Sequence, residues 1–227
     1  MPIWDSYNCI LQHYTNEGVV EVVKWNPSTG PYVWQLAQMN ECTTRYVNRY
    51  KYVMHIDTDE YLIPMREENL WQMLDNLEKS ANKIERMIGA FLFQNSFFYT
   101  FYKENPSWKI EDLNLTTLKY TSHGRFYGWK DRSKLVVLPE HVSSTMIHTL
   151  DSTYLHGTLL HGRETLQVSH GVAYLHHYRT HMAIGLEGGA LDGKTGTGRD
   201  RRALIWAQEL TLKMKQVLEK LRNKNCL

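Results

Sequence analysis

The sequence predicts an α/β domain built on a mostly parallel sheet that is flanked by helices. Strand-like and helix-like spacings alternate over the first quarter of the chain, which is typical of parallel strands joined by crossover helices. A short apolar run at 52–56 then leads directly into three acids, as strands do at the ligand-binding edge of an open sheet. Residues 201–223 form the clearest amphipathic helix pattern in the chain.

The composition fits one globular domain that spans residues 1–227. The chain is 42% hydrophobic and 22% charged with a net charge of +2, which argues against disorder and against a nucleic-acid-binding protein. No apolar run of about 18 residues predicts a membrane span, and the first residues do not resemble a signal peptide. The cysteines, Cys9, Cys42 and Cys226, form no zinc motif, although one pair is compatible with a disulfide in a lumenal compartment.

The first quarter of the chain supplies the alternation of strands and helices. We expect a strand end at 1–5, a helix at 7–14, a strand at 19–25, a helix at 31–47 and a strand at 52–56. Ser6 suits the N-cap of the first helix, and Gly18 suits the left-handed position that follows a helix. Pro31 suits the first position of the second helix.

The rest of the chain continues with helices, strands and two long loops. We expect a helix at 67–79, a strand at 87–93, an aromatic strand or groove wall at 97–102, a polar loop at 105–121, strands at 133–138 and 168–178, a mobile glycine-rich loop at 185–200 and a helix at 201–223. In the last helix, apolar residues from Ala203 to Leu221 recur on one face, so this face is predicted to pack inward.

Asp57, Asp59 and Glu60 form the main candidate site. Carboxylates are almost never buried unless they are paired or bind a metal, so three of them after a buried strand indicate a ligand site. A hard divalent ion such as Mn²⁺ or Mg²⁺ favours oxygen ligands and bridges nucleotide phosphates. If the strand continues, Asp57 and Asp59 share one side of it and repel each other unless a cation lies between them. The alternative is a solvated acidic turn.

A histidine from a distant strand is expected to complete this site, because His is the commonest metal ligand in proteins. His176 and His177 point to opposite faces of the predicted strand, so only one of them fits. The alternative for either residue is a buried core histidine. The spacings of the eleven histidines match no zinc pattern, so zinc is not predicted.

Two basic residues beside predicted strands, Lys134 and Arg179, are candidates to neutralise a diphosphate. The alternative for each is a surface cation at a strand end. Residues 188–195 also match the phosphate-loop pattern G-x-x-x-x-G-K-[ST], which raises a nucleotide hydrolase as another class of function. Gly196 and Gly198 follow at once and disfavour the helix that such a loop requires, so we rank this class last.

Four ordered sequence blocks carry a family resemblance. They are GVVEVVKW at 18–25; CTTR at 42–45 with YVMHIDTDEYLIP at 52–64; RSKLVVLPEHV at 132–142 with His148; and AYLHHYR at 173–179. Together these blocks resemble glycosyltransferase family 92, formerly a domain of unknown function. The ordered set is more specific than any single block.

The resemblance implies a GT-A-like fold, a UDP-sugar donor, a glycan acceptor and a divalent metal, usually Mn²⁺. It also implies transfer of a hexose, galactose in characterised members, with inversion, by a type II protein of the Golgi membrane that acts on the lumenal side. Carried over by position, the metal ligands are Asp57, Asp59 and His177. Together with the two basic candidates above, the residues expected to bind the donor are Asp57, Glu60, Lys134 and Arg179.

Compared with the family pattern, the chain is expected to lack the first strand and helix, together with the membrane anchor. A truncated, non-catalytic relative that binds a glycan or a partner is therefore the second candidate function. The catalytic base is not assigned; Glu60, Glu104, Asp131 and Glu140 are candidates to deprotonate the acceptor. The aromatic segment 97–102, with Trp108 and Trp129, is a candidate platform for the acceptor sugar, and core packing is its alternative.

Overall fold

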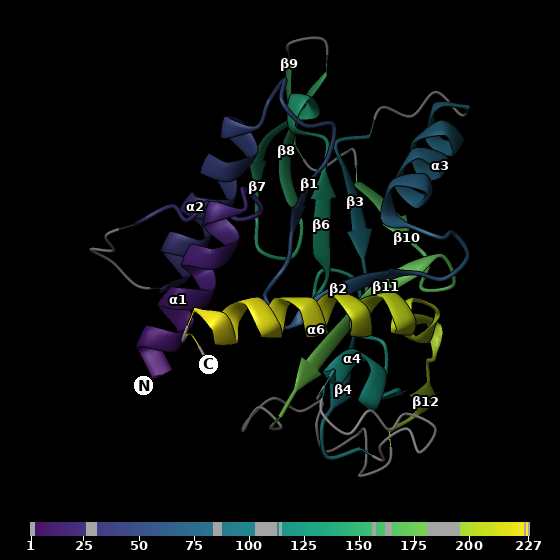
Figure 1. The fold of residues 1–227 in the computed structure, drawn as a ribbon. Helices are drawn as coiled ribbons and strands as arrows, with labels where there is room; N and C mark the ends of the chain where they lie inside the picture. The colour runs from purple at the N-terminus through teal and green to yellow at the C-terminus, as the bar shows by residue number, and fades with distance from the viewer. Residues whose placement is uncertain are drawn as a thin grey trace.

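A computed structural model describes residues 3–25, 31–83, 88–102, 113, 115–155, 158–161, 165–180, 196–224 and 226 as a mixed α/β domain (Figure 1). The helices are α1 (Ile3–Asn16), α2 (Pro31–Arg45), α3 (Leu70–Asn82), α4 (Thr116–Lys119), η1 (Pro139–His141), η2 (Arg202–Trp206) and α6 (Ala207–Asn223). The strands are β1 (Val53–His55), β2 (Glu60–Pro64), β3 (Ala90–Phe93), β4 (Asn95–Tyr99), β5 (Ser122–His123), β6 (Lys134–Val137), β7 (Val142–Thr145), β8 (Leu150–Leu155), β9 (Thr158–His161), β10 (Thr165–Val168), β11 (Ala173–Arg179) and β12 (Gly198–Arg199).

The central sheet has the strand order β1-β6-β3-β10, and only its β3–β10 pair is parallel. The prediction of a mostly parallel sheet is therefore wrong. It required residues 19–25 to be a strand, but they form no ladder, and Val19 is 70% exposed. Strand β1 pairs instead with β6, and this pairing is antiparallel.

The amino-terminal elements also differ from expectation. Residues 3–5, predicted to end a strand, form the first turn of α1, so Ser6 lies inside the helix rather than at its N-cap. Gly18 has a φ of 70°, which fits the left-handed position predicted for it after the helix. The predicted helix at 67–79 begins later, at Leu70, because Asn69 caps it by accepting a hydrogen bond from the Gln72 backbone at 2.9 Å.

Helices α2 and α3 cover opposite faces of the central sheet (Figure 1). Alternate residues of β3 show the division. Phe91 and Phe93 pack in the same cluster as Met73 of α3, whereas Ala90 and Leu92 belong to the cluster flanked by Cys42 and Tyr46 on the α2 side. Strand alternation therefore builds a core on each face from one short apolar run.

Three strands of the central sheet are each followed directly in the chain by a strand of a second sheet, which has the order β2-β11-β4. Strand β1 continues through a turn into β2, β3 continues through Gln94 into β4, and β10 continues through 169–172 into β11. The parallel pairing of β3 with β10 is continued by β4 with β11. The predicted strand at 168–178 is thus two strands, and the break between the sheets is where the three acids lie.

Two further sheets had no counterpart in the sequence prediction. Strands β7, β8 and β9 form an antiparallel meander, and β12 pairs with β5. These strands are short, and β7 (VSST) carries no apolar alternation that would distinguish it from a loop. Part of the predicted loop at 185–200 is therefore β12, while the phosphate-loop match at 188–195 lies outside the described residues.

The predicted helix at 201–223 consists of the short 3₁₀ segment η2 followed by α6. Asp200 fixes its start, because its carboxylate accepts hydrogen bonds from Tyr174 Oη and, at 2.6 Å, from Arg202 N. His176 Nε2 lies 3.3 Å from the same carboxylate. Burial alone raises the pKa of Asp200, but the nearby His176 imidazole and the hydrogen bonds from Tyr174 and Arg202 outweigh it and lower the pKa to about 2.

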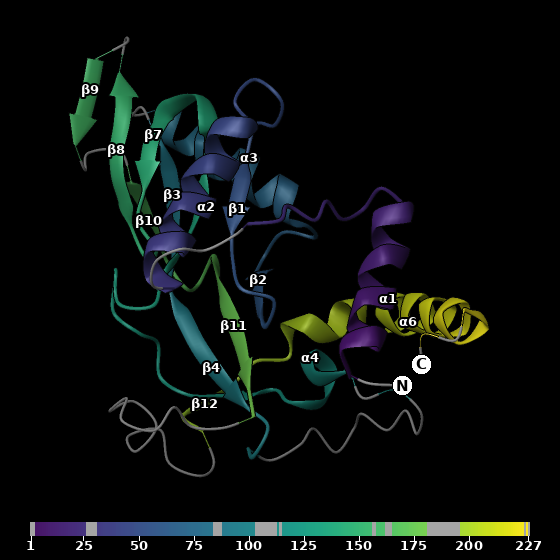
Figure 2. The same ribbon diagram turned by 90° about the vertical axis from the view of Figure 1, so that its left-hand side faces the viewer.

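Only part of the apolar face predicted for this helix is packed. Ala203, Ala207 and Leu221 are buried, whereas Leu210 is 37% exposed. Figure 1 and Figure 2 both show α6 running across the domain to α1, with the two chain ends close together. A disulfide between Cys9 of α1 and Cys226 joins these ends, with the Cα atoms 5.5 Å apart, and Cys42 remains a free thiol.

We expect Cys9→Ser to lower the free energy of unfolding by about 2 to 4 kcal/mol, because the disulfide closes a loop of 217 residues and so restricts the unfolded chain. Denaturant unfolding in non-reducing buffer measures this change. Cys226→Ser should give a similar loss, and Cys42→Ser is the matched control with an expected change below about 1 kcal/mol. Equal stability of Cys9→Ser and wild type in the absence of reductant would contradict the expectation.

Candidate active site

The three predicted acids lie at the break between the two sheets. Asp57 and Asp59 belong to the turn after β1, and Glu60 is the first residue of β2. The expected strand alternation at Asp57 and Asp59 is therefore wrong, because the chain turns there. The side chains of Asp57 and Asp59 are 47% and 46% exposed, whereas that of Glu60 is 1% exposed. The turn thus presents two carboxylates and buries the third.

The buried carboxylate of Glu60 connects four parts of the site. Its Oε2 accepts a hydrogen bond from Asp57 N at 3.0 Å and lies 3.4 Å from Lys134 Nζ. Its Oε1 accepts from Asn95 Nδ2 at 3.2 Å and lies 3.2 Å from His177 Nδ1. Burial raises the pKa of Glu60, and the Asp57 N–H and the Lys134 ammonium counteract that rise. Glu60 is placed to orient its neighbours, and its donor-binding role stays a prediction.

His177 lies opposite Glu60 in the β11–β2 ladder and opposite Phe97 in the β11–β4 ladder. Burial is the main reason that its pKa falls to about 4, so the imidazole is neutral at pH 7. Its Nε2 accepts a hydrogen bond from Arg179 Nε at 3.0 Å and faces Asp59 Oδ2 at 3.2 Å. His176 points to the other face of β11, toward Asp200, so His177 alone reaches the acids.

The two predicted cations also meet at this site. Lys134 Nζ donates to Asp57 Oδ2 at 2.8 Å, and only 7% of the Lys134 side chain is exposed, so the surface-cation alternative is wrong for Lys134. Arg179 ends β11 and places its guanidinium carbon 5.2 Å from the centre of the Phe97 ring. Residues from β6, β11 and the β1–β2 turn, far apart in the sequence, are therefore brought within direct contact.

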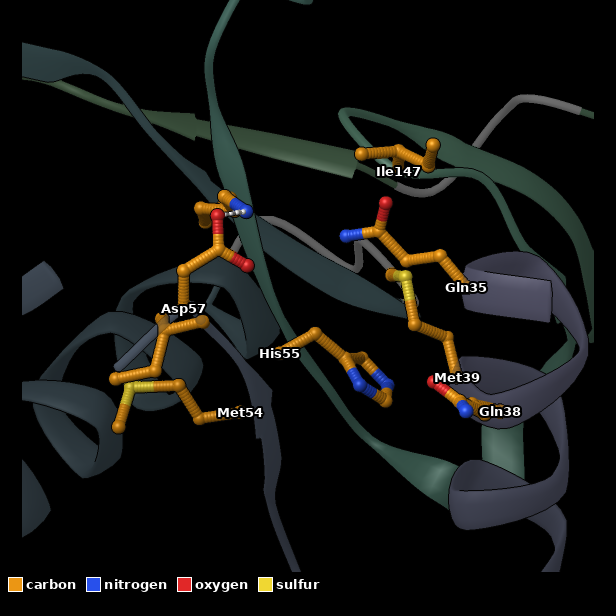
Figure 3. Close-up of a pocket in the computed structure, with 9 residues that line it drawn as sticks. Gln35, Gln38, Met39, Met54, His55, Asp57 and Ile147 are labelled. Atoms are coloured by element: carbon orange, nitrogen blue, oxygen red, sulfur yellow. Dashed lines mark hydrogen bonds and ion pairs between the residues drawn. The ribbon is translucent and has the colours of Figure 1, made fainter. Parts of the chain in front are cut away.

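Two adjoining cavities open at the turn. One, of about 230 Å³, lies between α2 and the end of β1, and Figure 3 shows Gln35 and Met39 on one wall with Asp57 on the other. The second, of about 180 Å³, extends to His177 and Arg179. Gln35, Asp57, Lys134 and Ile147 line both cavities. The combined space suits an elongated polar ligand that lies across the acidic turn.

Sequence reasoning missed several residues that line these cavities or hold their walls, among them Gln35, Asn95, Arg132 and His148. His148 belonged to a family-like block, yet nothing in the block indicated that its Nδ1 lies 2.9 Å from the Ser133 carbonyl while its ring lines the cavity. Arg132 is the first residue of the family-like block at 132–142, which is a signal that could have drawn attention to it, although it precedes β6.

The donors at the turn fit a divalent ion that shares its coordination with a substrate. Arg179 Nε donates to His177 Nε2, so the single lone pair of this nitrogen is directed at the guanidinium, and Asp59 Oδ2 lies 3.2 Å from the same nitrogen. A metal ion bound by Asp59 and His177 would take the place of this Arg179 donor. The carboxylate of Glu60 behind Nδ1 is the usual partner of a metal-binding histidine.

The number of protein ligands limits which ions fit. Within the described residues, no three side chains of His, Cys, Asp or Glu converge in metal-binding geometry. Asp59 and His177 would therefore supply the protein ligands, with Asp57 beside them on Lys134. Ions of the Mg²⁺ type bind in this way, through one or two carboxylates together with substrate phosphates and water.

A model of glycosyltransferase family 92 matches residues 2–220. The chain belongs to glycosyltransferase family 92. No curated protein matches it. Membership indicates a glycosyltransferase, which takes a sugar donor and a glycan acceptor. The matched range includes the acidic turn, Lys134 and the His-Tyr-Arg end of β11, so the cavities described above lie inside the family domain. Within the described residues, none of the helices is long and apolar enough to cross a membrane.

The candidate bases of the family 92 domain occupy different surroundings. Glu60 is buried and engaged with four neighbours, Asp131 is exposed, and Glu140 lines a separate pocket beside Arg49. Glu104 lies outside the described residues. Of these candidates, Glu60 is the one that lines the cavity beside His177, and its carboxylate oxygens are already hydrogen bonded. The base stays unassigned.

The predicted acceptor platform is largely core. Phe97, Phe98 and Tyr99 of β4 and the following Tyr102 are all buried, which is the core-packing alternative, and Phe101 alone in 97–102 is substantially exposed. Trp129 packs against the core cluster on the α2 side, and Trp108 lies outside the described residues. Aromatic density here reflects the stacking of rings in the second sheet rather than an open sugar-binding surface.

Proposed function

We propose that this family 92 domain is a metal-dependent glycosyltransferase that moves a hexose, galactose in our expectation, from a UDP-sugar to a glycan acceptor with inversion. The GT-A-like character of the fold belongs to the same proposal. The observation that carries it is the pair Asp59 Oδ2 and His177 Nε2, which face each other at 3.2 Å beside a cavity lined by Lys134 and Arg179.

The roles of the residues follow from this arrangement. Mn²⁺ or Mg²⁺, when bound, supplies Lewis-acid stabilisation of the charge that develops on the leaving diphosphate. Asp59 and His177 would hold the ion, and Glu60 fixes the orientation of the imidazole from behind. Lys134 would keep the Asp57 carboxylate in place, and Lys134 and Arg179 both line the cavity, where they would face the diphosphate. The site thus holds the diphosphate in a preorganised electrostatic environment.

The proposed setting is the lumenal side of the Golgi membrane. The Cys9–Cys226 disulfide supports an oxidising compartment, since disulfides are rare in reducing ones. The proposed partners are the UDP-sugar and the glycan, with no nucleic acid. By family resemblance, attachment to the membrane through an anchor segment belongs to the same proposal.

Calorimetry with UDP-galactose and other uridine diphosphate sugars, with and without Mn²⁺, tests the proposal together with an assay of transfer to a glycan. A transferase should show metal-dependent donor binding and transfer. Binding of a glycan without metal-dependent donor heat would instead support the non-catalytic relative. Nucleotide binding that disappears in Lys194→Ala would support the phosphate-loop hydrolase.

A further inference from the structure

Arg132 and Arg179 place their guanidinium groups against the same aromatic ring. The guanidinium carbon of Arg132 lies 5.4 Å and that of Arg179 lies 5.2 Å from the centre of Phe97. Phe97 is buried in β4 and packs edge-on against Tyr127, with ring centres 5.1 Å apart. The ring is therefore a fixed support, and it holds two cations at the wall of the cavity that both arginines line.

A guanidinium group that lies over an aromatic ring can still donate hydrogen bonds, because the ring face does not occupy its N–H groups. The five N–H groups lie in the guanidinium plane and point away from its edge. Arg179 uses Nε for His177 Nε2 at 3.0 Å. Arg132 Nε is buried, and it has no hydrogen-bond partner within the part of the chain that the structure describes. A buried donor without a partner is unfavourable, so the described part of the chain leaves some of the hydrogen-bonding capacity of Arg132 unsatisfied.

The charges around the two arginines are unbalanced. Lys134 is neutralised by Asp57 and Glu60, at 2.8 and 3.4 Å. Across the described ranges of the chain, no carboxylate lies within 4.0 Å of the charged nitrogens of Arg132 or Arg179. Three cations (Arg132, Lys134 and Arg179) and two carboxylates (Asp57 and Glu60) line the cavity, so its lining carries one net positive charge, and within the described residues neither guanidinium is paired with a carboxylate. A phosphate group provides the matching oxygens, because Arg binds phosphate through two parallel hydrogen bonds.

We propose that Arg132 and Arg179, held on Phe97, form a phosphate clamp that binds the diphosphate of the sugar nucleotide. The clamp rests on the proposed function, because that function supplies a diphosphate beside Asp59 and His177. It assigns a ligand to Arg132, and it gives the buried Phe97 ring a role as the support of both guanidinium groups. The chemistry that it recognises is the phosphate group, whether free or part of a nucleotide.

Calorimetry with inorganic pyrophosphate in buffer containing EDTA tests the clamp without metal. Wild-type protein should bind pyrophosphate, and Arg132→Gln should weaken this binding at least about tenfold, because it removes the charge and the paired donors. Arg132→Lys should restore part of the affinity as a point charge. Uridine, which has no phosphate, should bind equally to all three proteins if it binds at all. A comparison of the affinities for UDP and for uridine then shows whether the nucleotide, like free pyrophosphate, binds through its phosphate groups.

Arg125→Gln is the matched control. Arg125 also lies on an aromatic ring, with its guanidinium carbon 5.0 Å from the centre of Tyr127, but it does not line the cavity. Its substitution should leave pyrophosphate affinity within about twofold of wild type. Circular dichroism checks that each variant is folded. If Arg132→Gln is unfolded, the folded Arg132→Lys carries the test, with an expected loss of about threefold or more.

Wild-type affinity for pyrophosphate in Arg132→Gln, or no binding by the wild-type protein, would overturn the clamp. The outcome for the transferase is separate. Sugar transfer by Arg132→Gln with an unchanged KM for the donor would retain the transferase and remove the clamp. Pyrophosphate binding that depends on Arg132 in a protein with no metal-dependent donor binding would retain the clamp and remove the transferase.

Discussion

Asp59→Ala is expected to abolish metal-dependent sugar transfer and to leave the protein folded. The substitution removes the one carboxylate that faces His177 Nε2, so an ion at this position loses an oxygen ligand. Loss of a group that stabilises charge in the transition state lowers kcat by about 10² to 10³-fold. The Asp59 side chain is 46% exposed, so its removal creates no cavity in the core. The substitution should therefore leave the protein folded.

Initial rates of transfer over a range of Mn²⁺ concentrations measure the effect. Asp59→Asn keeps the shape but weakens the ligand, and it should fall between the wild type and Asp59→Ala. Asp151→Ala, which removes an exposed acid in β8, is the matched control and should retain the wild-type rate. A transfer rate in Asp59→Ala close to that of the wild type would rule out the assignment of Asp59 to the metal.

Glu60→Ala is expected to lower the free energy of unfolding by about 3 to 5 kcal/mol, the loss typical of breaking a buried ion pair from one side. The substitution leaves the buried ammonium of Lys134 with Asp57 as its one remaining ion-pair partner within the described residues. It also removes the acceptor for Asp57 N and the carboxylate beside His177 Nδ1. The two ends of the acidic turn are therefore released together.

Denaturant unfolding measures this effect, and a constant slope with denaturant shows that the native state is otherwise intact. Glu60→Gln keeps the volume and one acceptor oxygen, so its loss should be smaller than that of Glu60→Ala. Glu140→Ala removes an exposed acid in η1 and should change stability by less than about 1 kcal/mol. If Glu60→Ala is as stable as the control, the buried carboxylate does not hold the turn together.

The elements that sequence patterns predicted well are those whose signal is local. The helix expected at 31–47 is α2, and the strands expected at 52–56 and 133–138 contain β1 and β6. The pattern failed at 19–25, where an alternating valine-rich run forms no strand. A strand needs a partner as well as a suitable sequence, and within the described residues no strand pairs with this segment.

The features of the candidate site also fall into two groups, those that the sequence could predict and those that only the structure shows. The acids and Lys134 could be singled out from spacing, and the resemblance selected His177 of the two adjacent histidines. Glu60 contacts His177, which lies 117 positions later in the sequence. Arg132 contacts Phe97, which lies 35 positions earlier. No periodicity reports such contacts, because they arise only when β2, β4 and β11 pair side by side.

Residue order was enough to predict the mixture of helices and strands, the family and the charged residue types available at the site. Three features became visible only in the folded chain: β1 pairs antiparallel with β6, Glu60 is buried while Asp57 is exposed and Asp59 is half-buried, and Cys9 meets Cys226. Hydrophobic periodicity is a property of neighbours along the chain. Burial, charge pairing and disulfide pairing depend on which distant segments are packed together, and folding sets them all at once.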